Sequence, residues 1–216
     1  MKLKIKSNAE IRQRYQVSYP IRLSCLLSLA AMLAVVSSVV NANARPAGLF
    51  APYLQEIQSS LPPGLAMRLP SEIRLDASAG IKDSQIIVRI FPSKNPLTLT
   101  VSLFTCNLAT QPCLVGSFSV DSKTSVNAVQ EFQKHQASGN QITLSPKIRG
   151  YLLEGLPQKP SYRFSSVMWE QDGMFYRASF PAIERRNLLF MAYSMAHETP
   201  MRPIAPPSSP SQRFGF

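Results

Sequence analysis

The stretch that decides the fold runs from Leu97 to Val120 and reads LTLTVSLFTCNLATQPCLVGSFSV. From Leu97 to Leu103 every second residue is apolar, and the residues between them are threonine or serine. The same alternation returns after Cys113. A period of two is typical of a β-strand that buries one face. We therefore predict two strands, joined by the segment between Cys106 and Cys113.

The two cysteines and the apolar pattern predict the same pairing of these strands. If Cys106 lies opposite Cys113 in an antiparallel hairpin, three apolar pairs fall on one face, and the Thr and Ser residues between them fall on the other. The predicted apolar pairs are Leu103–Gly116, Val101–Phe118 and Leu99–Val120. A slip of one residue would turn each of these side chains to the other face. Opposed residues of paired strands are close enough for a disulfide, so we predict a hairpin pinned by a Cys106–Cys113 disulfide.

The first 44 residues are typical of an export signal. Six Lys and Arg residues precede an apolar run of 16 residues from Cys25 to Val40, and Ala42-Asn43-Ala44 follows as a cleavage sequence. The run is shorter than the roughly 20 residues that a membrane-spanning helix needs. We therefore predict a signal peptide over residues 1–44, cleaved after Ala44, and a periplasmic or secreted protein. The alternative is an uncleaved amino-terminal anchor, in which case this leader is the chain's contact with the membrane.

Charge and cysteine content limit the partners of the remaining chain. Its 17 basic and 11 acidic residues are scattered, whereas nucleic-acid binding usually requires a clustered basic surface. Two cysteines remain, an even number in a compartment that favours disulfides. A zinc site would have to combine Cys106 and Cys113 with His135 and His197. The six residues between the cysteines exceed the about two to four of structural zinc sites, so we expect neither a metal nor another cofactor, and no nucleic acid.

The order of the remaining elements predicts an α+β domain with extensions at both ends. Residues 45–64 form a lead-in with a short amphipathic helix, residues 65–198 form the domain, and residues 199–216 form a Pro/Ser-rich tail typical of disorder. Neighbouring strands join as hairpins, which favours an antiparallel sheet of about six strands. The segments with helical spacing are 48–60, 124–136 and the stretch after Pro181. We expect their helices to cover one face of the sheet.

A second hairpin is predicted around Asp172-Gly173, a strong signal for a two-residue turn. This turn pairs Trp169 with Tyr176. The residues that share their face are Val167, Ala178 and Phe180. An exposed aromatic pair could stack on a sugar or bind a peptide, so Trp169 and Tyr176 are candidate contacts for a ligand or partner. The alternative is that both rings fill the core between the sheet and a helix.

Several short motifs together resemble a family of uncharacterised small exported bacterial proteins, over roughly residues 65–197. The motifs in chain order are Leu69-Pro70-Ser71, Cys-x6-Cys, Gly116-Ser117-Phe118, Gly150-Tyr151, Trp169…Gly173…Tyr176 and Met191-Ala192-x-Ser194. The resemblance implies an exported domain and carries no activity to transfer. The chain departs from the family at Leu108, where a glycine is expected, and it lacks a cysteine near residue 160 that some members have.

The sequence gives little support to catalysis. Nucleophilic catalysis needs a base beside the nucleophile, and we expect both histidines, His135 and His197, on the surface. Glu170 and Asp172 lie at a hairpin tip, whereas a carboxyl that acts as a general acid is usually buried. We therefore expect a non-catalytic cell-envelope domain that binds an unknown protein or has a structural role. The alternatives are a small-ligand carrier with a cleft between the sheet and the last helix and, with less support, a hydrolase.

Overall fold

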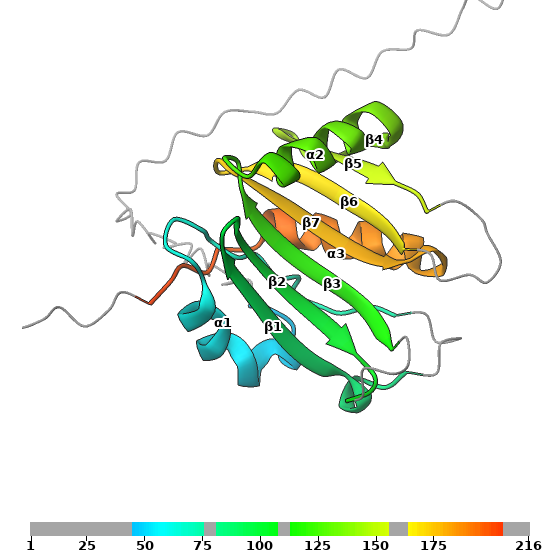
Figure 1. Ribbon diagram of the computed structural model, residues 1–216. Helices are drawn as coiled ribbons and strands as arrows, with labels where there is room; N and C mark the ends of the chain where they lie inside the picture. Colours follow the sequence, from blue (N-terminus) through cyan, green and yellow to red (C-terminus); the bar gives the residue numbers. More distant parts are fainter. Residues whose placement is uncertain (1–44, 76–80, 108–112, 156–163, 205–216) are drawn as a thin grey trace, which may run out of the picture. The chain divides into compact units, whose positions relative to one another are not determined.

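Seven antiparallel strands form one sheet in the computed structural model, which describes residues 45–75, 81–107, 113–155 and 164–204 (Figure 1). In chain order the strands are β1 (Ile87–Lys94), β2 (Leu97–Phe104), β3 (Leu114–Ser122), β4 (Asn140–Ser145), β5 (Ile148–Leu153), β6 (Phe164–Gln171) and β7 (Met174–Pro181). Across the sheet their order is β1-β2-β3-β7-β6-β5-β4. The predicted α+β class with an antiparallel sheet is confirmed. The predicted leader lies outside the described residues, and no described helix is long and apolar enough to cross a membrane.

The hairpin of β2 and β3 has the predicted register. Its apolar pairs are Leu99–Val120, Val101–Phe118 and Leu103–Gly116. Beyond Leu103 a β-bulge shifts the pairing, so that Phe104 lies opposite Leu114. The Cys106–Cys113 disulfide closes the hairpin just past this bulge, with 5.7 Å between the two Cα atoms.

The hairpin of β6 and β7 also has the predicted register, with Trp169 opposite Tyr176. Asp172 and Gly173 form its turn, and both have positive φ angles, of 52° and 75°. A two-residue turn of this kind requires the left-handed region, which asparagine, aspartate and glycine adopt at the lowest cost. The Asp-Gly pair therefore fixes the register of these two strands.

The inner face of the sheet carries the main core. The helical segments are η1 (Gly48–Tyr53), α1 (Leu54–Ser60), η3 (Asp83–Gln85), α2 (Val126–Ser138), η4 (Ala182–Glu184) and α3 (Arg185–His197). Of these, η1 and α1 lie beneath the β1 side of the sheet, and α3 lies beneath β6 and β7 (Figure 1). Phe50 of η1 meets Phe118 edge to face, with 6.0 Å between ring centroids. The predicted apolar stripe of α3, which includes Leu188 and Met191, is fully buried.

Helix α2 packs on the opposite, outer face, so the expectation that the helices share one face holds only for α1 and α3. Ala128 of α2 is buried with Met168 and Phe175, which point away from the Trp169 side of the sheet. The topology gives the reason. The chain must travel from the end of β3 across three strands to begin β4, and the inner face is already covered.

Residues from both predicted extensions contact the domain. Phe50, Ile57 and Leu61 of the supposed lead-in are buried in the core. The supposed tail is held at Met201, whose backbone exchanges two hydrogen bonds with Met67, of 2.7 and 2.9 Å. Residues 205–216 of the predicted tail lie outside the described residues.

Candidate functional site

The predicted aromatic contact pair is in the core. Trp169 and Tyr176 both have 0% exposure, and their rings stack with 5.6 Å between centroids. The Trp169 indole donates to Gln171, and the Tyr176 hydroxyl donates to the carbonyl oxygen of Ala66 at 2.8 Å. Burial raises the pKa of Tyr176, so its hydroxyl stays a donor. Neither ring can bind a partner at the surface, and the alternative of core packing is correct.

The predicted ligand cleft between the sheet and the last helix is also occupied by the core. Leu188, Met191 and Met195 of α3 have no exposure and belong to the same cluster as Trp169. A small-ligand site at this position would require the helix to leave the sheet. The prediction of that cleft is therefore wrong.

His135 was predicted at the surface and is instead fully buried, with 0% exposure. Its Nδ1 lies 2.8 Å from the carbonyl oxygen of Glu131, and its Nε2 lies 2.7 Å from the hydroxyl of Ser166. Burial lowers the pKa of His135, with a further contribution from the positive charge of Arg177, while Glu131 opposes the shift. His135 is therefore a neutral, hydrogen-bonded link between α2 and β6. His197, by contrast, is exposed as predicted.

The cysteine and carboxylate candidates are each engaged in a structural contact. Cys106 and Cys113 are bonded to each other, which removes both from a zinc site. Glu170 forms an ion pair with Lys123, and Asp172 forms one with Arg68, each at 2.6 Å. These contacts point the two carboxylates at different cations, and they do not converge on a common cleft.

A partly buried polar cluster around Arg68 was missed by sequence reasoning. One terminal nitrogen of Arg68 donates to Asp172 and the other to the backbone carbonyl of Glu198, at the end of α3. Ser71 and Ser194 meet through their hydroxyls at 2.9 Å, and the Ser71 backbone N–H also donates to Ser194. We call these five residues the Arg68 cluster.

The Arg68 cluster connects three of the short motifs that are far apart in the chain. Ser71 belongs to the Leu-Pro-Ser motif, Ser194 to the Met-Ala-x-Ser motif, and Asp172 to the turn of the Trp…Gly…Tyr hairpin. Burial raises the pKa of Glu198, which the hydroxyls of Ser71 and Ser194 and the charge of Arg68 oppose. The cluster holds the segment after Leu65 against the hairpin tip and α3. The motifs themselves were a signal that these segments meet.

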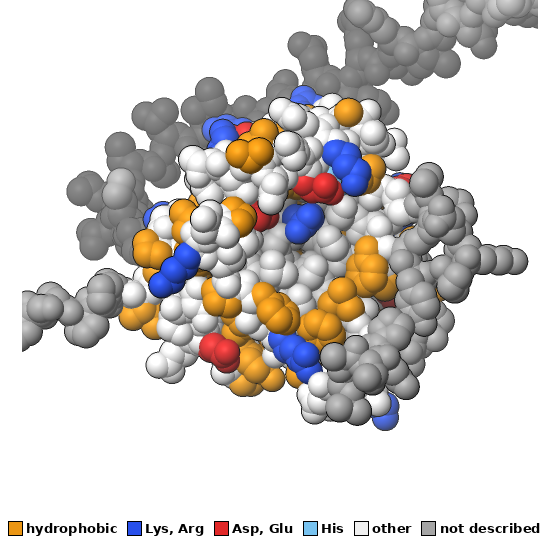
Figure 2. All heavy atoms as spheres, in the orientation of Figure 1, with side chains coloured by type: hydrophobic (Ala, Val, Ile, Leu, Met, Phe, Trp, Pro, Cys, Tyr) orange, Lys and Arg blue, Asp and Glu red, His pale blue; other side chains and the backbone are white. Residues whose placement is uncertain are grey.

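The outer face of the sheet is open where α2 does not cover it. Over β1–β3 it carries Thr and Ser side chains along its middle and hydrophobic side chains near the end of the hairpin (Figure 2). We call the group Arg89, Phe91, Phe104 and Leu114 the aromatic patch. Phe91 is 48% exposed, and its ring lies 6.5 Å from that of Phe104. The guanidinium of Arg89 lies over the Phe104 ring at 5.0 Å and donates to the carbonyl of Asn107.

A second surface feature lies at the end of β1. A groove of about 770 Å³ is lined by Ser59, Ser60, Leu61, Pro62, Pro63, Gly64, Pro92, Lys94, Arg202, Pro203 and Ile204. We call it the proline groove. Most of its lining is apolar, and its charged side chains are two cations, Lys94 and Arg202.

No family model, curated protein or solved structure matches the chain.

Proposed function

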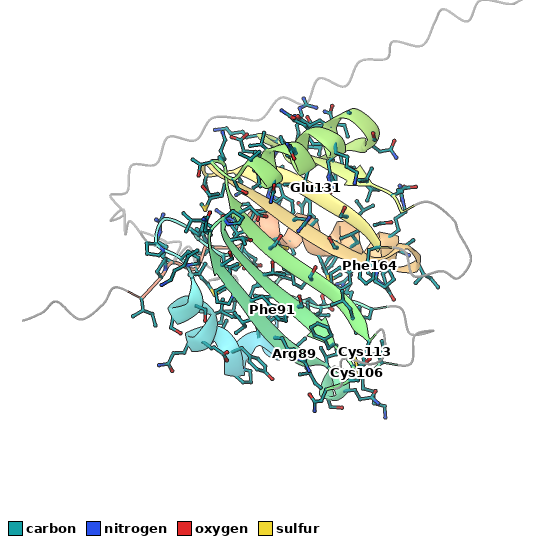
Figure 3. The ribbon with its side chains drawn as sticks, viewed as in Figure 1. Arg89, Phe91, Cys106, Cys113, Glu131 and Phe164 are labelled. Carbon is teal, nitrogen blue, oxygen red and sulfur yellow. A yellow bond between two sulfur atoms is a disulfide. The ribbon has the colours of Figure 1, made fainter. Side chains whose placement is uncertain are left out.

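We propose that this chain is an exported, non-catalytic domain of the cell envelope that binds a protein partner through the aromatic patch. The observation that carries the proposal is the exposure of Phe91, beside Arg89 and Phe104, on a part of the sheet that no described helix covers. Aromatic and arginine side chains dominate the energy of protein interfaces. Figure 3 shows Arg89 and Phe91 side by side on β1, near the disulfide.

Rigid support makes the aromatic patch suitable for binding. Phe91 and Arg89 lie on one strand, and Phe104 is held on the next by the ladder of β1 and β2. The Cys106–Cys113 disulfide constrains the hairpin end that carries Phe104 and Leu114. Side chains fixed in this way lose little conformational freedom on binding.

Site-specific crosslinking in intact cells tests the site. A photoreactive residue at Phe91 should give a discrete protein adduct, and the same residue at Thr143, exposed on the far edge strand β4, should not. Arg89→Ala in the same chain should weaken the Phe91 adduct several-fold. Equal adducts at both positions, or none at Phe91, would contradict the proposed interface.

Thiol counting tests the export separately. The chain has three cysteines, of which Cys25 lies in the predicted leader. We expect protein denatured without reductant to take up no maleimide-polyethylene glycol, because the leader is removed and the other two thiols are bonded. One adduct would indicate a retained leader, and three adducts would contradict export.

A further inference from the structure

We propose that the proline groove binds a free, single-chain anionic amphiphile, of which a fatty-acid anion is the simplest case. This site is separate from the aromatic patch, so each can fail without the other. Three segments that are distant in the sequence build the groove: the end of α1 with residues 61–64, the end of β1, and residues 202–204 after the Met67–Met201 bridge (Figure 1).

The walls of the groove suit an apolar chain. Four of the eleven lining residues are prolines, which have no backbone N–H and a fixed φ angle. The groove therefore offers few backbone donors to a polar ligand, and its walls lose little freedom when it fills. Ile204 adds aliphatic surface to the groove and is 53% exposed. The volume of about 770 Å³ lies within the roughly 300–1,000 Å³ of small-molecule sites.

The charges of the groove select an anion. Lys94 and Arg202 both line the groove, and both are exposed. Neither forms an ion pair with another described residue. The described lining contains no aspartate or glutamate. A carboxylate whose chain lies along the prolines would place its charge between a cation from β1 and a cation from the terminal segment. Charge-assisted hydrogen bonds from lysine and arginine to a carboxylate are among the stronger polar contacts of proteins.

Calorimetric titration with decanoate tests the site. The protein is purified from cells in the form that they export. We expect saturable binding with one site per chain. The Lys94→Met/Arg202→Met variant should bind decanoate about tenfold or more weakly, since each hydrogen bond to a charged group contributes to affinity. The matched control is Lys147→Met/Arg149→Met, which removes two exposed cations at the opposite edge of the sheet and should bind like the wild type.

Two further ligands distinguish binding in the apolar groove from binding to surface charge alone. Octanoate, shorter by two methylenes, should bind about 15-fold more weakly, because each buried methylene contributes about fourfold. Decanol, which has the same chain and no charge, should also bind at least about tenfold more weakly than decanoate. Ile204→Asp, which places a carboxylate on the apolar wall, should abolish decanoate binding and leave the melting temperature unchanged.

Several results would overturn the proposal. These are no saturable binding of decanoate, equal losses in the Lys94/Arg202 variant and its control, and equal affinities for decanoate and decanol. A protein that binds phosphatidylglycerol vesicles through Lys94 and Arg202 but takes up no decanoate would also overturn it. That result would assign the two cations to a membrane surface instead.

Discussion

Gly116 lies where two parts of the core approach each other closely. It is opposite Leu103 on the inner face, and a Cβ atom at this position would collide with the ring of Phe180. Phe180 in turn packs on Phe118, with 5.3 Å between ring centroids. The glycine of the Gly-Ser-Phe motif is therefore required by packing, because the ring uses the space that a side chain would fill.

We predict that Gly116→Ala lowers the free energy of unfolding by about 1–3 kcal/mol, the usual cost of overpacking a core. Urea denaturation would measure the loss, and Gly48→Ala is the control because its added Cβ meets no atom within 4 Å. The two changes Gly116→Ala and Phe180→Leu should be less damaging together than the sum of their separate effects. Strict additivity would show that the ring and the glycine do not interact.

Single residues were also where prediction from the sequence failed most clearly. His135 was placed at the surface, although it lies seven residues after Ala128 and three after Phe132, on the same face of α2. That spacing indicated burial. Its partner, the Ser166 hydroxyl, could not be predicted, because the sequence does not show which face of the sheet α2 covers.

At the scale of elements, the two hairpins were predictable because covalent or turn chemistry agreed with the apolar pattern. The cysteine pair and the Asp-Gly turn each select one register, and the alternation of the strands selects the same one. The signal for the face of the sheet on which α2 packs was weaker. Met168 and Phe175 are apolar residues on a sheet face whose other residues are mostly polar, and α2 packs on these two side chains.

Removal of the disulfide tests whether the apolar alternation alone can determine the register of β2 and β3. Cys106→Ser/Cys113→Ser should lower the free energy of unfolding by about 2.5 kcal/mol, the loop-entropy value for so short a loop. The amides of β2 and β3 should still show their cross-strand contacts by nuclear magnetic resonance. Wild-type protein treated with reductant should lose the same stability, and the variant should not respond to reductant. A changed register in the variant would mean that the disulfide, and not the apolar alternation, determines it.

The terminal segment provides a second test at this scale. Truncation after Glu198 removes Met201 and both of its backbone hydrogen bonds to Met67. We expect this to lower the melting temperature by several degrees, because it exposes the buried segment of residues 65–69. A chain that ends at Ile204 retains both bonds and is the matched control. Equal melting temperatures for the two truncations would show that the bridge contributes nothing.

In the described part of the molecule as a whole, two buried ionisable groups, one in α2 and one just after α3, have pH dependences that oppose each other. His135 lies under α2 on the outer face, and Glu198 lies in the Arg68 cluster at the end of α3. Neither was predictable as a site, because each depends on segments that meet only after the sheet has formed. The stability from His135 increases as the pH rises toward 6.5, whereas the stability from Glu198 decreases as the pH rises above 4.5, so the two contributions oppose each other.

His135 should make the folded protein less stable at acid pH. Its folded pKa lies below the ordinary value of 6.5, because burial disfavours the charged ring. The unfolded chain therefore binds the proton more readily, so stability is complete above pH 6.5 and is lost as the pH falls toward the folded pKa. His135→Gln should reduce the fall in melting temperature between pH 7.5 and 5.5. The control is His197→Gln, which changes an exposed ring. If the melting temperature of His135→Gln fell as much as that of the wild type between pH 7.5 and 5.5, the assignment to His135 would be contradicted.

Glu198 acts in the opposite direction to His135. Its folded pKa lies above the ordinary value of 4.5, because its carboxyl is buried and its Oε2 has no hydrogen-bond partner among the described residues. The folded state favours the protonated form, so the stability from this group is complete below pH 4.5 and is lost as the pH rises through the folded pKa. Glu198→Gln keeps the shape of the side chain without its charge. It should raise the melting temperature at pH 7.5 and leave it unchanged at pH 4, while Glu56→Gln, at an exposed position of α1, should change neither. A lower melting temperature at pH 7.5 would mean that the carboxylate is a net stabilising partner of Arg68, which would contradict the raised pKa.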